Sequence, residues 1–172
     1  MIQWGLIGSL TCIAFITDIR HCKIPNWLTF TGVWVGLLYH GVLEGMNGIL
    51  FSVFGLLFGL ILLFILYLFG AIGAGDVKLF AAYGAIAGME FVTHSMVYAV
   101  LYAGLIGITI LIVQKKLLQR MLWIFHAMFS FLIMKELLVF QNIPQNQMLS
   151  FPFMWAVVPA IFTYGFSMKG MI

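Results

Sequence analysis

Two aspartates at the boundaries of apolar segments are the residues best suited to chemistry in this sequence. Asp18 follows a first apolar run, and Asp76 lies between two further apolar runs, directly after the glycine-rich stretch 70–75. The chain of 172 residues has only five carboxylates, so an acid placed there calls for an explanation. Two carboxylates held close in a partly desolvated site share a proton and titrate as a pair. Such a pair can activate water for peptide hydrolysis, because one carboxylate takes a proton from water while the other donates to the peptide carbonyl.

The composition is that of an integral membrane protein. Hydrophobic residues make up 64% of the chain and charged residues 8%, whereas a soluble domain has about 25% charged residues. The net charge of +3 is too small for a nucleic-acid surface, which needs a denser basic face. The N-terminus lacks the basic region of a secretory signal, so the first apolar run is expected to be retained. By length, residues 1–172 are expected to form one transmembrane domain.

Apolar segments predict an all-α, polytopic fold with about six transmembrane helices. For residues 121–140, which include Lys135 and Glu136, an interfacial amphipathic helix is favoured over a span. Small residues in the fourth segment predict that it is buried among its neighbours. Glycines four residues apart predict close helix packing at Gly32 and Gly36, and again at Gly55 and Gly59. The six expected spans are residues 4–17, 27–43, 49–69, 76–89, 96–113 and 151–166.

The basic residues predict that both aspartates face the cytoplasm. Lys and Arg follow the first, third and fifth segments and are absent from the turns after the second and fourth. Because cations near span ends mark the cytoplasmic side, Asp18 and Asp76 are expected at the same face of the inner (plasma) membrane. A shared face is what permits them to act as a pair. The basic residues concerned are Arg20, Lys23, Lys78, Lys115, Lys116 and Arg120.

Both aspartate motifs resemble those of one protease family. The string Gly73-Ala74-Gly75-Asp76 resembles the G-x-G-D signature of intramembrane aspartyl proteases, and its extension through Lys78 and Leu79 more narrowly resembles the type IV prepilin peptidases. The segment 18–29 resembles that family's first-aspartate loop, and residues 151–160 resemble its last span. The marked residues in the first-aspartate loop are Ile24, Pro25, Asn26, Leu28 and Thr29.

The resemblance implies an aspartic endopeptidase that serves type IV pilus or protein secretion systems. Asp18 and Asp76 would be its catalytic pair, and the substrate would be a prepilin-like membrane protein whose basic leader is cut at the cytoplasmic membrane boundary. The glycines would give an extended substrate access to Asp76. Lys78 has two possible roles: it anchors the helix end at the cytoplasmic membrane surface, or it binds substrate or tunes Asp76. Asn26 likewise either caps a helix or helps to place the loop. The expected substrate-binding residues are Gly73, Gly75, Lys78 and Asn26.

Long members of that family carry a cytoplasmic insertion with paired C-x-x-C motifs. Here the first segment meets Asp18 directly, and neither cysteine belongs to a C-x-x-C pair. We therefore expect no metal and no cofactor, and the absence of the insertion argues against the N-methyltransferase activity that many long members have.

A small transporter or channel subunit is the alternative from another class. In such a protein the same two aspartates would relay protons or bind a cation. Transport predicts an acid deep within a span, whereas Asp18 and Asp76 are expected at span ends, which favours the peptidase. A non-catalytic membrane assembly protein with the same fold is a third possibility.

Overall fold

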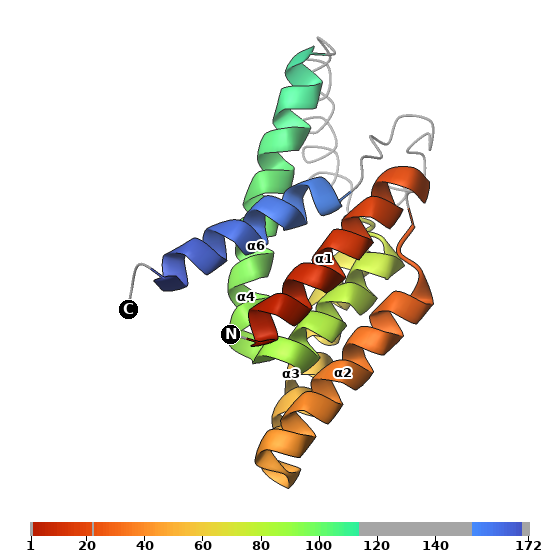
Figure 1. Cartoon of the computed structure of the whole chain (residues 1–172). Helices are drawn as coiled ribbons and strands as arrows, with labels where there is room; N and C mark the ends of the chain where they lie inside the picture. Colours follow the sequence, from red (N-terminus) through yellow and green to blue (C-terminus); the bar gives the residue numbers. More distant parts are fainter. Residues whose placement is uncertain (1, 22, 114–152, 170–172) are drawn as a thin grey trace, which may run out of the picture. The chain divides into compact units, whose positions relative to one another are not determined.

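The structure is a computed structural model that describes residues 2–21, 23–113 and 153–169. Contacts divide the chain into two compact units, one of Met1–Tyr102 with Pro152–Ile172 and one of Ala103–Phe151. The described part of the second unit is helical residues 103–113, and the rest of this section concerns the first unit. The helices, shown in Figure 1, are α1 (Ile2–His21), α2 (Asn26–Glu44), α3 (Met46–Leu68), α4 (Ala74–Val113) and α6 (Met154–Lys169).

These helices confirm the all-α membrane class. Three of the described helices, α1, α3 and α4 as far as Ile110, are long and apolar enough to cross a membrane, and α6 is a shorter apolar helix. The described residues thus do not support a count of six spans. Helix α1 continues to His21, so Asp18 lies inside its last turn instead of following the helix. The predicted interfacial helix at 121–140 lies outside the described residues.

The fourth and fifth expected segments form one bent element, α4. The polar stretch 90–94, expected to separate them, is helical. The only non-helical residue in α4 is Gly88, with φ 82° and ψ −177°. A positive φ favours glycine, and a Cβ at Gly88 would collide with the Phe51 ring of α3. Figure 1 shows that, within the first unit, residues 89–102 run in a different direction from the part of α4 before this bend.

Side chains from neighbouring helices bind the backbone next to this bend. An interrupted helix leaves carbonyls without intrahelical donors, and lipid cannot supply them. Ser52 Oγ on α3 donates to the Ala85 carbonyl at 2.9 Å. His40 Nε2 on α2 donates to the Ile86 carbonyl at 3.0 Å. Both side chains are buried, so the bend is stabilised from two sides.

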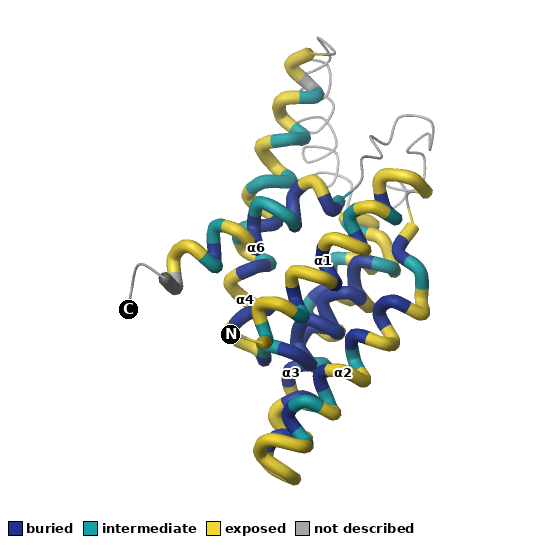
Figure 2. Tube along the Cα trace, in the orientation of Figure 1, coloured by how far each residue is buried: buried dark blue, intermediate teal, exposed yellow. Residues whose placement is uncertain are grey.

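The first part of α4 is the centre of the unit, as its small residues predicted. Every residue from Val77 to Ile86 except Lys78 is buried, and Figure 2 shows buried positions on the inward faces of the surrounding helices. Glycine allows this proximity on α2 and α3: a Cβ at Gly36 would lie 2.7 Å from the Ala85 carbonyl, and one at Gly55 would overlap the Gly84 carbonyl. The predicted close packing at Gly32, Gly36, Gly55 and Gly59 is confirmed, since each faces α4.

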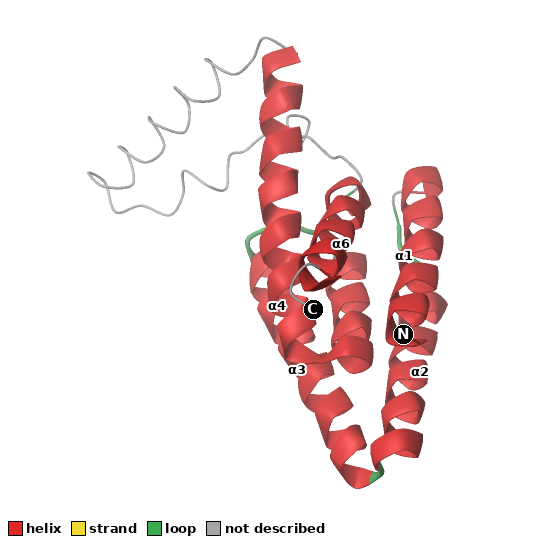
Figure 3. Cartoon of the chain, turned by 60° about the vertical axis from the view of Figure 1, so that its left-hand side comes forward, coloured by secondary structure: helices red, strands yellow, loops and turns green. Residues whose placement is uncertain are grey.

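The loops of this bundle divide between its two ends. The connections from α1 to α2 and from α3 to α4 lie at one end, whereas the turn at Gly45 between α2 and α3 lies at the other (Figure 3). The C-terminal turn of α1 and the first turn of α4 therefore share one end of the bundle.

The packing around α4 predicts that Gly55→Ala destabilises the protein. The added methyl group has no space beside the Gly84 carbonyl, and overpacking of this kind costs about 1–3 kcal/mol. Thermal unfolding of the purified protein should show a lower midpoint. The control is Gly8→Ala on α1, where a Cβ meets nothing within 4 Å, so the midpoint should stay or rise slightly. Equal midpoints for Gly55→Ala and the wild type would contradict the packing described.

Candidate active site

Asp18 and Asp76 lie at the same end of the bundle, the one that carries the loops after α1 and α3. Their exposed fractions are only 6% and 8%. The two carboxyl groups are near enough for their charges to interact. Thus the structure brings together the two acids that the sequence singled out, although 58 positions separate them (76 − 18).

Asp76 is held by the start of its own helix. The Gly73 carbonyl accepts from the backbone N–H groups of Asp76 and Val77 at 3.1 and 3.4 Å, which makes Gly73 the N-cap. The Gly73 N–H in turn donates to Asp76 Oδ2 at 3.1 Å. This is one half of a capping box, in which the third helical residue binds the N-cap N–H. Helix α4 therefore begins at Ala74, two residues before the expected start.

Asp18 is held by a helix that begins far along the chain. Its Oδ2 accepts from the backbone N–H of Met154 at 3.2 Å. Met154 is the first residue of α6, whose first N–H groups have no partner within the helix and carry the positive end of its dipole. The carboxylate of Asp18 thus joins the end of α1 to the start of α6.

A second polar pair sets the register between α1 and α4. Tyr83 Oη and Thr11 Oγ1 are 2.8 Å apart, and both residues are buried. The Thr11 hydroxyl donates to the Ile7 carbonyl at 2.7 Å, so the Tyr83 hydroxyl is the donor to Thr11. Thr11 precedes Asp18 by seven residues and Tyr83 follows Asp76 by seven, which is about two helical turns in each case. The antiparallel register that pairs Thr11 with Tyr83 therefore also sets Asp18 opposite Asp76.

Asn26 and Lys78 bind each other. Lys78 Nζ donates to Asn26 Oδ1 at 2.9 Å, and both residues are exposed. Asn26 is the first residue of α2, whose N-cap is Pro25 with no side-chain cap, so the cap expected from Asn26 is wrong. Because residues two apart on a helix lie about 200° apart around its axis, Lys78 faces away from Asp76.

The two glycines of the motif differ in their surroundings. A Cβ at Gly73 would lie 3.3 Å from Asp76 Oδ2, so this glycine leaves room for the carboxylate. A Cβ at Gly75 would lie 3.1 Å from Cβ of Ile24, in the loop before α2. Gly75 therefore gives close packing against the chain's own loop, and its contact with a substrate stays a prediction.

Sequence reasoning missed three partners in this region. The Met154 N–H belongs to the backbone and has no sequence signal. Thr11 and Tyr83 do have one, because they are polar residues in apolar helices, each seven residues from an aspartate. In the parts of the chain that the structure describes, no three His, Cys, Asp or Glu side chains cluster closely enough to hold a metal ion.

Comparison with known proteins places these residues in a family. The model of the type IV leader peptidase family matches residues 5–112, which include both aspartates. The chain belongs to the type IV leader peptidase family. The resemblance expected from the two aspartate motifs is confirmed, and membership agrees with the apolar helices of an integral membrane protein.

A curated relative from Pectobacterium carotovorum subsp. carotovorum is similar to this chain over about two thirds of the chain's length. That protein is called prepilin leader peptidase/N-methyltransferase and is 30% identical over 128 residues, which cover 68% of this chain. The same alignment covers 43% of the relative, so the chain spans less than half of that protein's length. No solved structure matches the chain.

The register between α1 and α4 can be tested with a double-mutant cycle. Thr11→Val and Tyr83→Phe each remove one hydroxyl of the buried pair, and we expect their effects on the free energy of unfolding to be non-additive by about 0.5–1.5 kcal/mol. Chemical unfolding of the four proteins in detergent gives this coupling.

Thr17→Val is the matched control for that cycle. The Thr17 hydroxyl donates only to carbonyls within α1, those of Ile13 and Ala14. Its combination with Tyr83→Phe should be additive. Additive effects for Thr11→Val with Tyr83→Phe would mean that the pair does not join the two helices.

Proposed function

We propose that this protein is a membrane aspartyl endopeptidase that removes the basic leader from prepilin-like proteins. Asp18 and Asp76 would be its catalytic pair, and the cut would lie at the cytoplasmic membrane boundary. The observation that carries the proposal is that two buried aspartates, from segments far apart in the chain, lie at the same end of the bundle. Membership of the type IV leader peptidase family supports the same reaction.

The surroundings of the two acids suit water activation. Each carboxylate has one oxygen, Oδ2, bound by a backbone N–H, from Met154 for Asp18 and from Gly73 for Asp76. These bonds fix the orientation of each group, and among the described residues neither Oδ1 has a hydrogen-bond partner. A water held between the two carboxylates could give its proton to one of them while the other protonates the oxygen of the scissile carbonyl. The product of attack is a tetrahedral diol, and no covalent link to the enzyme forms.

The charge at this end of the bundle supports a cytoplasmic active site. Arg20, Lys23 and Lys78 all lie near the loops beside the aspartates, whereas the turn at Gly45 carries no Lys or Arg. Cations gather at the cytoplasmic ends of spans. A membrane protein with a leader on that side would reach the aspartates without crossing the bilayer.

The loop before α4 offers a route for the substrate backbone. Gly73 is exposed, lies beside Asp76 and presents no side chain toward it. An extended peptide could pair with the loop at this point, as peptides do when they add to an exposed backbone edge. We propose that the substrate backbone approaches at Gly73 and not at Gly75, because Ile24 packs against the position that a Gly75 side chain would occupy.

Transport is less well supported than proteolysis. A proton or cation pathway would place an acid deep within a span. Asp76 is the third residue of α4, and Asp18 lies in the last turn of α1. Both acids are thus near helix ends, where a soluble leader has access.

Co-expression with a prepilin-like substrate tests the proposal. Asp18→Asn and Asp76→Asn should each reduce cleavage by about 10²–10⁴-fold, because an amide cannot exchange the proton. Mass spectrometry of the substrate reports its shortened N-terminus. The control is Glu44→Gln, which replaces an exposed carboxylate at the end of α2. This variant should cleave the substrate at the wild-type rate. Normal cleavage by either asparagine variant would disprove the dyad.

The role of the α6 N-terminus can be tested without changing Asp18. Met154→Pro removes the N–H that Asp18 accepts, and proline is well tolerated in the first turn of a helix. We expect cleavage to fall about tenfold or more relative to Met154→Ala, because hydrogen bonds to charged groups are the stronger ones.

Met154→Ala is the matched control because it removes the same buried side chain and keeps the N–H. The unfolding midpoint of each variant is measured as well, because the lost hydrogen bond between α6 and α1 also lowers the stability of the proline variant. Equal cleavage rates for the proline and alanine variants would show that the Met154 N–H does not position Asp18 for the reaction.

A further inference from the structure

A groove on the outer surface of the bundle is separate from the aspartate pair. It has a volume of about 490 Å³ and is lined by residues of α2, α3 and α4. Neither aspartate lines it: α4 contributes Lys78 and Ala81, whereas Asp76 lies on another face of that helix. The lining residues are Asn26, Trp27, Thr29, Phe30, Val33, Leu56, Leu60, Lys78 and Ala81.

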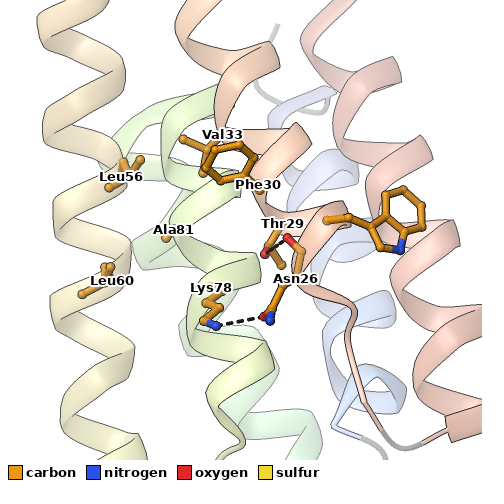
Figure 4. A pocket seen from close by; sticks show the side chains of 9 residues that line it. Asn26, Thr29, Phe30, Val33, Leu56, Leu60, Lys78 and Ala81 are labelled. Atoms are coloured by element: carbon orange, nitrogen blue, oxygen red, sulfur yellow. Dashed lines mark hydrogen bonds between the residues drawn. The ribbon is translucent and has the colours of Figure 1, made fainter.

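The groove is polar at one end and apolar along the rest. Figure 4 shows Lys78 and Asn26 pointing toward each other at one end, with Phe30 and Val33 of α2 and Leu56 of α3 toward the other. The polar end lies beside the loop before α2, and the apolar part runs along α2 and α3, of which α3 is long and apolar enough to cross a membrane. This order of groups matches a phospholipid, whose charged phosphate stays at the interface while its acyl chains enter the hydrocarbon.

Charge at the polar end selects an anionic ligand. Lys78 has three N–H donors and gives one to Asn26 Oδ1 at 2.9 Å. Within the described residues Lys78 has no carboxylate partner, and the amide nitrogen of Asn26 has two donors of its own. The pair can therefore donate several hydrogen bonds to phosphate oxygens while the stem of Lys78 lies against apolar surface.

We propose that this groove binds one anionic phospholipid, with its phosphate on Lys78 and Asn26 and an acyl chain along Phe30, Val33, Leu56 and Leu60. The apolar stem of a prepilin-like substrate fits less well. Its basic leader would be brought beside the Lys78 cation, where like charges repel. It would also lie on the side of α4 that faces away from Asp76. The lipid site does not depend on the proposed peptidase reaction.

Lipid retention by the purified full-length protein tests this site. The protein is exchanged into micelles that contain equal amounts of phosphatidylglycerol and phosphatidylcholine, and bound lipid is counted by native mass spectrometry. Wild type should retain phosphatidylglycerol in preference to phosphatidylcholine. Lys78→Gln keeps a side chain of similar length without the charge and should reduce that preference about fivefold or more. Leu60→Trp fills the apolar part and should lower retention of phosphatidylglycerol.

Matched controls separate this site from general attraction to anionic lipid. Lys23→Gln removes an exposed cation near the same end that does not line the groove, and it should keep the wild-type preference. Inorganic phosphate alone should not displace the lipid, because the acyl chain contributes to binding. Elution volume in gel filtration confirms that each variant is folded.

Several results would overturn the lipid proposal. These are equal retention of the two lipids by wild type, an equal loss of preference in Lys23→Gln and Lys78→Gln, or displacement by inorganic phosphate. Unchanged lipid preference in Lys78→Gln together with a raised KM for a prepilin-like substrate would assign the groove to the peptide instead. Selective lipid retention by a protein that cleaves no prepilin would leave the lipid site standing while the peptidase proposal fails.

Discussion

Backbone-to-backbone contact around the first part of α4 is the constraint on which the rest of the bundle depends. In lipid, helices gain little from burying apolar side chains, so close packing must hold them together. Gly55 of α3 meets the Gly84 carbonyl, and Gly36 of α2 meets that of Ala85, distances that no larger residue permits. Because Asp76 is in the first turn of this enclosed helix, the packing of α4 also sets the position of the acid.

The central helix separates two kinds of polar chemistry. One side carries Asp76, which lies at the same end of the bundle as Asp18 and the start of α6. Another side carries Lys78, which binds Asn26 at the end of an apolar groove between α2 and α3. A helix places residues two apart on nearly opposite faces, so one short motif presents an acid on the side of Asp18 and a cation at the groove.

Much of the fold follows from local patterns. The apolar segments predicted the helices, and the glycine pairs predicted close helix packing at their positions, although not that α4 is the partner. Helix boundaries were less accurate, because capping is decided by backbone geometry: the Gly73 N–H binds Asp76, so α4 starts at Ala74. The break expected at 90–94 was wrong because polar residues do not end a helix by themselves. The bend is at Gly88, where φ is positive and Ser52 and His40 bind the freed carbonyls.

The sequence by itself determined the membrane class, and it predicted the two aspartates and the glycine motif by which the chain resembles the family, because these are local in composition or spacing. Only the tertiary structure decided what holds those acids. Asp18 accepts from the Met154 N–H, and Tyr83 meets Thr11 across 72 positions. Lys78 turned out to bind Asn26, 52 positions away. Periodicity shows which face of a helix a residue occupies, but not which distant backbone or side chain meets that face, since this depends on how all the helices pack at once.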